Sequence, residues 1–296
     1  MEGTLTIHLM ASQDEGISMD TIINWNELWK AIHVSSRLRT EKDRDPKKIW
    51  NKKAGAYSRI TKDEKESTKQ ELSMLDLLPT DTVLDMGAGT GRLSVPIAGM
   101  VSHVTALDAS EGMLSHLEGR MAADGRTNYS VVVKRWEDVS VGTDIPVHDV
   151  VIAAFSLGFY DVGAALRKLD AAARRSVHLF WHMGPWRGPE EMALYTAVHG
   201  EEGTRQVGYP DALFLVNILH GRGIYADIRI YHALWETVYE SPKEAAEQWI
   251  TMHAPDFEDL DLVTRHFSER LRKDDAGKFH ERSVRTTAMV SWKKGE

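Results

Sequence analysis

Short apolar runs alternate with helix-patterned segments along most of the chain. From residue 82 onward, the runs TVLDM, HVTALDAS, YSVVVKR, HDVVIAAFS and SVHLFWH are predicted as strands. Segments such as SEGMLSHLEGRMAADG and DVGAALRKLDAAARR lie between them and carry apolar residues at helical spacing. Several strand runs lack polar–apolar alternation, as expected for parallel strands buried on both faces. This order predicts an α/β fold with a doubly wound parallel sheet.

The first 70 residues show a different pattern. Residues 18–34 place isoleucine, leucine and tryptophan side chains at helical spacing, and a second helical piece runs from Ile49 towards Tyr57. A highly charged connector, SRLRTEKDRDPKK, joins the two. Simple packing on the main domain and a lid over a cofactor or substrate both explain these helices. We assign 1–70 as an N-terminal helical cap or lid and 71–296 as the main domain.

The C-terminal third continues the alternation and adds helices. EEMALYTAV and PDALFLVNILHGRG are predicted as helices, and IYADIRIYHALWETVY as a long strand. SPKEAAEQWITMH opens with Ser241, Pro242 and Glu244, the pattern of a capping box with proline at the first helical position. A charged helix over about 257–273 precedes the last strand, VRTTAMVSW. The two helices form an insertion over about 241–275, which is placed to shape a substrate pocket.

The stretch VLDMGAGTGRLS, between the first strand and the next helix, carries the candidate chemistry. Asp85 ends the first strand, and Asp108 ends the second, where a carboxylate can accept hydrogen bonds from ribose hydroxyls. The dinucleotide fingerprint needs its third glycine where Arg92 stands, and a carboxylate beside the turn would repel a pyrophosphate. A Walker A loop is excluded here because no Gly-Lys-Ser/Thr follows. The pattern favours a nucleoside with a cationic group over a dinucleotide.

Four motifs occur in order over residues 82–182: VLDMGAGTGRLS, VTALDAS followed by EGML, VVVKRWEDV, and HDVVIAAFSLGFYD. In composition and spacing they resemble the motifs of the class I S-adenosylmethionine-dependent methyltransferases. The resemblance implies a Rossmann-like, seven-stranded, mostly parallel sheet with an antiparallel last strand. It also implies S-adenosyl-L-methionine as cofactor and in-line transfer of its methyl group to an acceptor.

The resemblance further implies a set of cofactor-binding residues. These residues are Tyr57, Asp85, Gly87, Ala88, Gly89, Asp108, Ala109, Met113, Trp136, Glu137, Ala154 and Phe155. The glycines would let the backbone approach the methionine moiety, and Asp108 would hold the ribose hydroxyls. Trp136 and Glu137 would flank the adenine mostly through backbone groups. Many relatives have an aspartate where this chain has Arg135, so we expect the adenine amino group to be bound differently.

The catalytic residue is left open by the sequence. Methyl transfer from a sulfonium needs alignment and exclusion of water, and it needs a general base only if the acceptor must lose a proton. His182, after the fifth strand, and Tyr160, after the fourth motif, are the candidates for such a base. A histidine satisfied by backbone groups at a strand end explains His182 equally well. The remaining histidines show no metal-ligand spacing, so no metal site is expected.

Composition narrows the classes of partner. The chain has 296 residues with 44 Asp and Glu against 36 Lys and Arg, a net charge of −8, which argues against nucleic acid. The absence of cysteine excludes a thiolate nucleophile, a disulfide frame and a Cys-ligated metal. There is no apolar stretch of the roughly 20 residues that span a membrane, and the N-terminus is a poor secretory signal. We expect a cytoplasmic monomer or homodimer that acts on a small molecule, away from membranes.

Two alternatives to the enzyme remain. The first is a non-catalytic S-adenosylmethionine-binding protein or partner subunit, since intact motifs predict binding and not turnover. The second is an NAD(P)-dependent dehydrogenase, which Arg92 in the third glycine position disfavours. The fourth motif also lacks the [DN]-P-P-[YF] loop of amino-group methyltransferases that act on adenine or glutamine.

Overall fold

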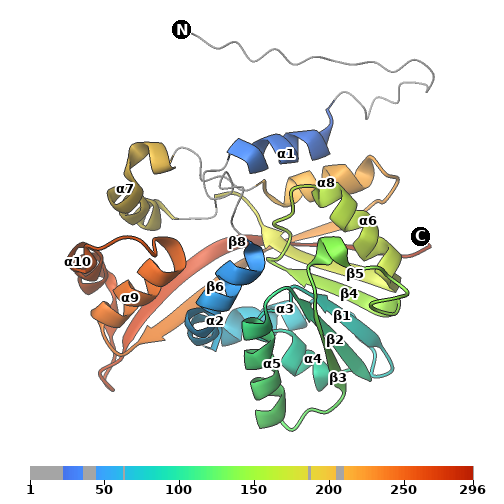
Figure 1. The fold of residues 1–296 in the computed structure, drawn as a ribbon, viewed down its shortest axis with the longest axis horizontal. Helices are drawn as coiled ribbons and strands as arrows, with labels where there is room; N and C mark the ends of the chain where they lie inside the picture. Colours follow the sequence, from blue (N-terminus) through green and yellow to red (C-terminus); the bar gives the residue numbers. More distant parts are fainter. Residues whose placement is uncertain (1–22, 36–44, 63, 186–187, 205–209, 296) are drawn as a thin grey trace.

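A mixed β-sheet forms the centre of the computed structural model, which describes residues 23–35, 45–62, 64–185, 188–204 and 210–295. Its strands within these ranges are β1 (Thr82–Met86), β2 (His103–Asp108), β3 (Tyr129–Val133), β4 (His148–Ala154), β5 (Ala173–His182), β6 (Asp227–Tyr239), β7 (Arg272–Lys273) and β8 (Phe279–Lys293). The order is β3-β2-β1-β4-β5-β8-β6, with β7 beside β8 (Figure 1).

The strand directions confirm the predicted fold class. Strands β1 to β5 pair in parallel, and β8 lies antiparallel between β5 and β6. The sheet is therefore doubly wound, mostly parallel and reversed at its last strand, as predicted. The two-residue β7 adds one short strand to the seven that were expected.

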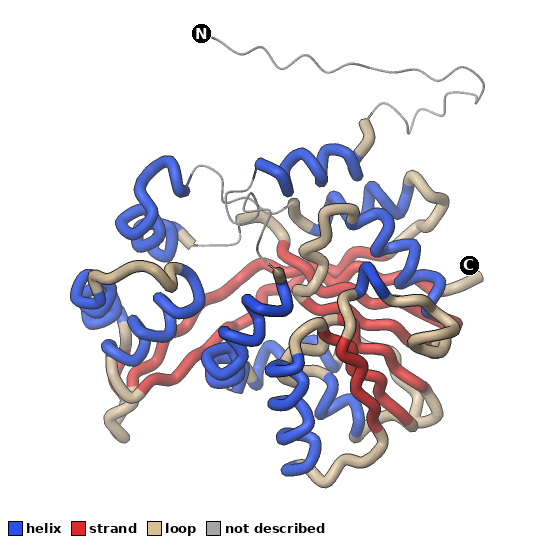
Figure 2. The backbone as a smooth tube through the Cα atoms, in the orientation of Figure 1, coloured by secondary structure: helices blue, strands red, loops and turns tan. Residues whose placement is uncertain are grey.

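Ten α-helices and a 3-10 turn in the described ranges connect and cover the strands (Figure 2). They are α1 (Trp25–Ser35), α2 (Pro46–Lys62), α3 (Lys65–Leu72), α4 (Ser94–Ala98), α5 (Glu111–Ala123), the 3-10 turn η2 (Trp136–Asp138), α6 (Val162–Ala172), α7 (Pro189–Thr204), α8 (Ala212–His220), α9 (Pro242–His253) and α10 (Leu260–Arg270). Residues 1–22 of the predicted cap and the part of the charged connector over 36–44 lie outside the described ranges.

Both faces of the sheet are buried, which explains the apolar strand runs. In β1, Leu84 joins a core with α6 and α8, whereas its neighbour Val83 joins a second core with α4 and α5. Both side chains have no exposed surface. Each burial of a side chain of this size contributes about 1.5–3 kcal/mol. The alternating directions of consecutive side chains thus fill two cores from one strand.

Helix α1 is docked on the main domain by Trp29. The Trp29 side chain is fully buried, its Nε1 donates to Phe159 O at 2.8 Å, and its ring lies 6.2 Å from that of Trp181. The Asn26 amide donates to Asp161 Oδ1, the N-cap of α6. For α1, the packing interpretation of the N-terminal tryptophans therefore applies. The boundary at residue 70 stays a prediction.

The long strands β6 and β8 carry the predicted insertion. They pair from Asp227–Ser291 to Tyr239–Phe279, and α9 and α10 lie at the far end of this ribbon (Figure 1). Ser241 caps α9, because its Oγ accepts from the Glu244 N–H at 3.1 Å. The helices and the ribbon share a small apolar core of their own. This arm extends the sheet beyond the helices of the main domain.

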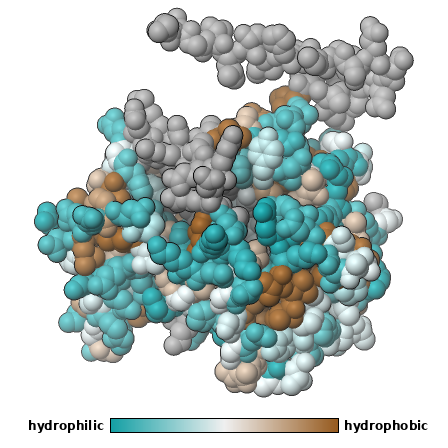
Figure 3. All heavy atoms as spheres, in the orientation of Figure 1, coloured by the Kyte–Doolittle hydropathy of each residue, from teal (hydrophilic) through white to brown (hydrophobic). Residues whose placement is uncertain are grey.

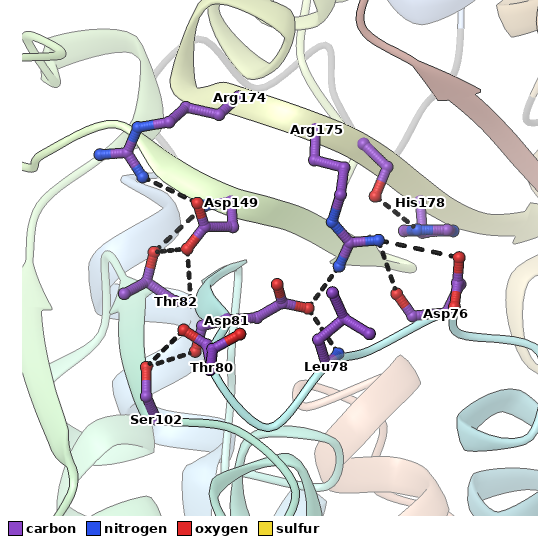
Figure 4. Close-up of polar contacts among 11 residues, drawn as sticks. Asp76, Leu78, Thr80, Asp81, Thr82, Ser102, Asp149, Arg174, Arg175 and His178 are labelled. Carbon is purple, nitrogen blue, oxygen red and sulfur yellow. Dashed lines mark hydrogen bonds and ion pairs between the residues drawn. The ribbon is translucent and has the colours of Figure 1, made fainter.

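The amino ends of β1 and β4 are fixed by ion pairs and hydrogen bonds (Figure 4). The backbone N–H and Oγ1 of Thr82 each donate to Asp149 Oδ2 at 2.8 Å. Arg175 of β5 donates to Asp81, which also accepts from the Leu78 N–H at 2.6 Å. These charges lie at the opposite end of the strands from the predicted site, so we interpret them as structural.

The outer surface carries both hydrophilic and hydrophobic side chains. On the face shown in Figure 3, hydrophilic side chains predominate and hydrophobic patches are separated from one another. Tyr225, Val284 and Ile230 are among the large apolar side chains that are exposed, a normal feature of folded proteins. In the described part of the chain, every helix is too short or too polar to cross a bilayer.

Candidate functional site

A large cleft opens at the carboxyl ends of β1, β2 and β4, where the strand order reverses. Its volume is about 2060 Å³. In open α/β sheets, ligands bind at this switch point. Helices α2, α9 and α10 and the ribbon of β6 and β8 complete its walls, so residues of the predicted insertion line this cleft.

Most of the predicted cofactor-binding residues line this cleft together. The lining members are Tyr57, Gly87, Gly89, Asp108, Ala109, Met113, Trp136, Glu137, Ala154 and Phe155. Asp85 and Ala88 are buried and do not belong to the lining. The structure thus brings residues from five separate segments to one place, while their contacts with a cofactor stay a prediction.

The three glycines of the turn after β1 serve two different purposes. Each has a positive φ, which L side chains rarely adopt. A Cβ on Gly87 would lie 2.3 Å from Ser156 Cβ, and one on Gly91 would lie 2.9 Å from Leu117 Cγ. A Cβ on Gly89 would have only Tyr57 Cε1 nearby, at 3.7 Å. Only Gly89 therefore fits the expectation of a backbone left bare for a ligand.

Asp85 lies behind the turn, away from the cleft. It accepts from Ser94 Oγ at 2.5 Å at the start of α4, and burial raises its pKa to about 6. This contact explains how Asp85 holds the turn in place. Asp85 is one of the expected cofactor-binding residues, but direct contact with a ligand does not follow from this position.

Asp108 spans the turn and faces the cleft. Its Oδ2 accepts from the Gly89 N–H at 3.0 Å, and its Oδ1 accepts from the Ser110 N–H at 2.8 Å. Burial raises the pKa of this carboxyl. Each carboxylate oxygen has a second acceptor site left. Asp108 can therefore accept hydrogen bonds from two neighbouring hydroxyl groups, the role predicted for it.

The predicted adenine side is formed more by backbone than by side chains. The Trp136 ring is buried, and its Nε1 lies 3.4 Å from Ala165 O in the core. Arg135, the departure from the usual family pattern, forms an ion pair with Glu137 at 3.3 Å. Both side chains of that pair are about half exposed, so it adds little stability.

Phe155 has a strained backbone at the edge of the cleft. Its φ of 54° is the one positive value among the non-glycine residues described. Its N–H donates to Phe180 O at 3.0 Å, which holds it beside β5. The Phe155 ring lies 5.1 Å from His182 and 5.5 Å from Trp235. Such strain costs about 1–3 kcal/mol and is typical of functional sites.

The two candidate bases differ in position. His182 is buried and lines the cleft, stacked beside Phe155. Tyr160 is 53% exposed and its ring lies 5.8 Å from His33. It is not part of the cleft lining, so the structure does not place it to face an acceptor. Among the described residues, no three His, Asp or Glu side chains gather as a possible metal site.

Sequence reasoning missed a buried ionic network beside the cleft. Arg92 donates from Nη1 to Glu71 Oε2 at 2.6 Å, and its Nε lies 3.5 Å from Glu64 Oε2. Tyr231 of β6 donates to Glu71 Oε1 at 3.0 Å. The one available signal was Arg92 in a glycine position. The two glutamates lie in or beside the polar helix α3, and nothing in KESTKQEL indicates their burial.

The comparisons with known proteins agree with this architecture. Residues 83–176 match a family model described as a methyltransferase domain. An uncharacterised protein of Haemophilus influenzae is 31% identical over 180 residues, which cover 60% of this chain and 64% of that protein. The match thus spans less than two thirds of this relative.

Two solved structures share the fold at low identity. A proposed methyltransferase of Bacillus halodurans gives a TM-score of 0.53 at 14% identity, over 77% of this chain and 99% of that one. The YcgJ protein of Bacillus subtilis gives a TM-score of 0.52 at 14% identity, over 78% of this chain and 98% of that one. At this identity, the likeness concerns the fold alone.

Proposed function

We propose that this chain, a member of the class I S-adenosylmethionine-dependent methyltransferases, transfers the methyl group of S-adenosylmethionine to a small molecule bound in the cleft. The cofactor would lie across the turn after β1, beside Asp108. When bound, it supplies a methyl group already activated by its sulfonium. The protein has to hold, orient and shield the reactants.

The observation that carries this proposal is the geometry around Gly89. The turn exposes bare backbone to the cleft there, with the Tyr57 ring on one side. The Asp108 carboxylate is fixed to the Gly89 N–H at 3.0 Å and retains acceptor sites for vicinal hydroxyls. A ribose carrying an amino-acid chain fits this arrangement of carboxylate acceptor sites and bare backbone. Its fit supports S-adenosylmethionine as the cofactor.

Helix α2 supports the exclusion of water from the same place. It contacts both α5 and α9, so it crosses the cleft between the main domain and the arm. Asn51 Oδ1 accepts from the Gly112 N–H at 3.0 Å, and Lys53 Nζ donates to Met252 O at 2.6 Å. This position corresponds to the lid interpretation for the second N-terminal helix. Enclosure strengthens each polar contact with the reactants.

A small-molecule acceptor is supported by the walls of the cleft and by the net charge of the whole chain. The cleft is bounded by the arm and α2, and the chain has a net charge of −8. Nucleic acid requires a positively charged surface that this composition disfavours. Aromatic side chains such as Trp50, Trp235 and Trp249 line the space beyond the cofactor turn. They would pack against an organic acceptor.

Isothermal titration calorimetry tests the cofactor first. We expect binding of S-adenosylmethionine and S-adenosylhomocysteine, and much weaker binding of NAD⁺ and NADP⁺. Gly89→Arg, which fills the bare position, should abolish binding while the fold is retained by circular dichroism. Binding of NAD⁺ with no binding of S-adenosylmethionine would refute the proposal in favour of a dehydrogenase.

Turnover is tested with tritiated S-adenosylmethionine and the small-molecule fraction of a cell extract. The wild-type protein should transfer label to an extractable compound, and Gly89→Arg should not. Cofactor binding with no transfer to small molecules, protein or RNA fractions would instead support a non-catalytic binding protein. Transfer to RNA alone would contradict the proposed acceptor class.

A further inference from the structure

One corner of the cleft holds polar atoms that the proposed cofactor site does not use. We call it the α3 corner and define it by Glu64, Arg92, Phe155, His182 and Trp235. Arg92 joins its members, because its guanidinium pairs with Glu64 and lies 5.9 Å from the Phe155 ring. The Phe155 ring in turn contacts those of His182 and Trp235. All but Arg92 belong to the cleft lining.

Glu64 has an unusual environment for a carboxylate. Its residue is 3% exposed, and Oε2 accepts no hydrogen bond from the described residues. Arg92 gives it an ion pair at 3.5 Å, but the shorter contact of Arg92, at 2.6 Å, goes to Glu71. Burial raises the pKa of Glu64 to about 7, against the opposing effect of Arg92. A group of this kind takes up and releases a proton near neutral pH.

The other charged or titratable groups that face Glu64 come from several elements. They are Tyr57 on α2, Glu71 on α3, Arg92 in the turn after β1, Arg120 on α5 and Arg285 on β8. The arginines favour the ionised form of Glu64, and Glu71 favours the protonated form. Burial raises the pKa of Tyr57 above its ordinary range, so its phenol remains protonated near neutral pH.

Trp235 adds a hydrogen-bond donor, its indole N–H, to the same corner. Its Nε1 is buried and donates to no group in the described part of the chain. Its ring and the Phe155 ring pack at a steep angle, and the Arg285 guanidinium lies 5.0 Å from the centre of the Trp235 ring. A buried donor without a partner is costly unless a ligand satisfies it. The corner therefore offers one hydrogen-bond acceptor and one donor to a molecule in the cleft.

We propose that Glu64 is the proton acceptor for the methyl-accepting atom, and that the acceptor is therefore an amine or a hydroxyl compound. This inference rests on the proposed function. The lone pair of the N–H or O–H group attacks the methyl carbon, and the carbon–sulfur bond breaks with its electrons left on sulfur. The proton of that N–H or O–H passes to Glu64 Oε2 and then to solvent. The Trp235 N–H would bind an oxygen or nitrogen of the same acceptor.

Proton linkage tests the position of Glu64 without knowledge of the acceptor. S-adenosylmethionine carries a sulfonium charge that S-adenosylhomocysteine lacks, and a positive charge near Glu64 lowers its pKa. Calorimetry at pH 7 in phosphate and in Tris gives the protons released by each ligand. The wild-type protein should release several tenths of a proton more with S-adenosylmethionine than Glu64→Gln does. Both proteins should release similar numbers with S-adenosylhomocysteine.

Glu281→Gln is the matched control for this measurement. Glu281 also lines the cleft, and burial also raises its pKa, but its Oε2 already accepts from Tyr239 at 2.9 Å. Its substitution should leave the difference between the two ligands unchanged. Equal proton release by the wild type and Glu64→Gln would overturn the inference. Failure of both ligands to bind would overturn the proposed function instead.

Transfer of label to the small-molecule fraction tests the chemical role. At pH 7, Glu64→Gln should lower the rate about 100-fold or more, with the dissociation constant for S-adenosylhomocysteine changed less than about threefold. At S-adenosylmethionine concentrations well below saturation, where the rate reports the protein free of cofactor, the wild-type rate should rise with pH to about 7 and then level off, and this step should vanish in the variant. A rate within threefold of the wild type would overturn the inference. His182→Gln, made in parallel, should keep the step.

Glu64→Asp keeps the inference testable if Glu64→Gln fails to fold. The shorter carboxylate should retain the pH step and part of the excess proton release with S-adenosylmethionine. A folded Glu64→Asp protein that binds both ligands but shows neither signature would count against the assignment just as firmly.

Discussion

Alanine at Gly87 and at Gly89 should separate stability from ligand binding. Both glycines have a positive φ, 75° and 55°, so alanine pays a similar backbone cost of about 1–2 kcal/mol at either position. Part of this cost is offset, by about 0.4–1 kcal/mol, because alanine restricts the unfolded chain. From the backbone alone, we expect each variant to lose about 1 kcal/mol.

The surroundings make the two positions unequal. At Gly87 the new methyl would lie 2.3 Å from Ser156 Cβ, so the chain after β4 must move, which adds about 1–3 kcal/mol of overpacking. At Gly89 the methyl meets no atom closer than 3.7 Å and projects towards the cleft. We therefore expect a total loss of about 2–4 kcal/mol for Gly87→Ala and of about 1 kcal/mol for Gly89→Ala.

Urea unfolding followed by circular dichroism measures the first difference, and calorimetry with S-adenosylhomocysteine measures the second. Gly89→Ala should weaken binding more than tenfold despite its near-normal stability. Gly119→Ala is the control, because Gly119 lies in the exposed part of α5 with no atom within 4 Å and should gain about 0.5–1 kcal/mol. Equal losses of stability at Gly87 and Gly89, or unchanged ligand affinity in Gly89→Ala, would refute this account of the turn.

Three further substitutions test the site and its frame. Asp108→Asn should weaken S-adenosylmethionine binding by about 1–3 kcal/mol in calorimetry, because the amide offers one acceptor where the carboxylate offers two; unchanged affinity would place the ribose elsewhere. Asp85 has a folded-state pKa of about 6 against an ordinary 3.8, so the folded state binds the extra proton and the unfolding free energy falls as pH rises from about 4 to 6. Asp85→Asn, followed by urea unfolding across that window, should remove this slope and add about 1–3 kcal/mol at pH 7. Asp161→Ala removes the N-cap of α6 and the partner of Asn26, and should lower the unfolding free energy by about 1 kcal/mol or more; a change below 0.3 kcal/mol would exclude a role in docking α1.

The α3 corner includes residues outside the four sequence motifs, such as Glu64 and Trp235. Glu64 and Arg92 are separated by the whole of α3 and β1, and Tyr231 reaches Glu71 from β6. Burial removes such charges from water at a cost, so these ion pairs are stabilising only when their geometry is good and further hydrogen bonds satisfy their polar atoms. These ion pairs lie beside Phe155, whose backbone is strained. One edge of the cleft therefore has buried charges, a strained backbone and a carboxylate oxygen, Glu64 Oε2, that accepts no hydrogen bond from the described residues. The proposed acceptor chemistry depends on that concentration.

The sequence by itself determined the sheet and the position of the glycine-rich turn after β1. Helices cover both faces of the sheet, so the side chains on both sides of each strand must be apolar. Continuous apolar runs such as VLDM and VVIAA therefore predict strands directly. The cap Ser241 could also be identified from local sequence, and its side chain accepts from the backbone N–H three residues ahead. Most of the motif residues line one cleft because the carboxyl ends of parallel strands share an edge.

Only the tertiary structure decided which polar side chains enter that cleft and in what state. Two consecutive residues have different environments: the Phe159 carbonyl accepts a hydrogen bond from the Trp29 side chain, whereas the Tyr160 side chain lies at the surface. In the sequence, Glu64 is one more charge beside a polar helix, whereas in the structure it is buried and senses the charges of Arg92, Arg120 and Arg285 from distant segments. Periodicity reports which face of an element is apolar, but the pKa of a carboxylate depends on neighbours that the chain brings together from far away.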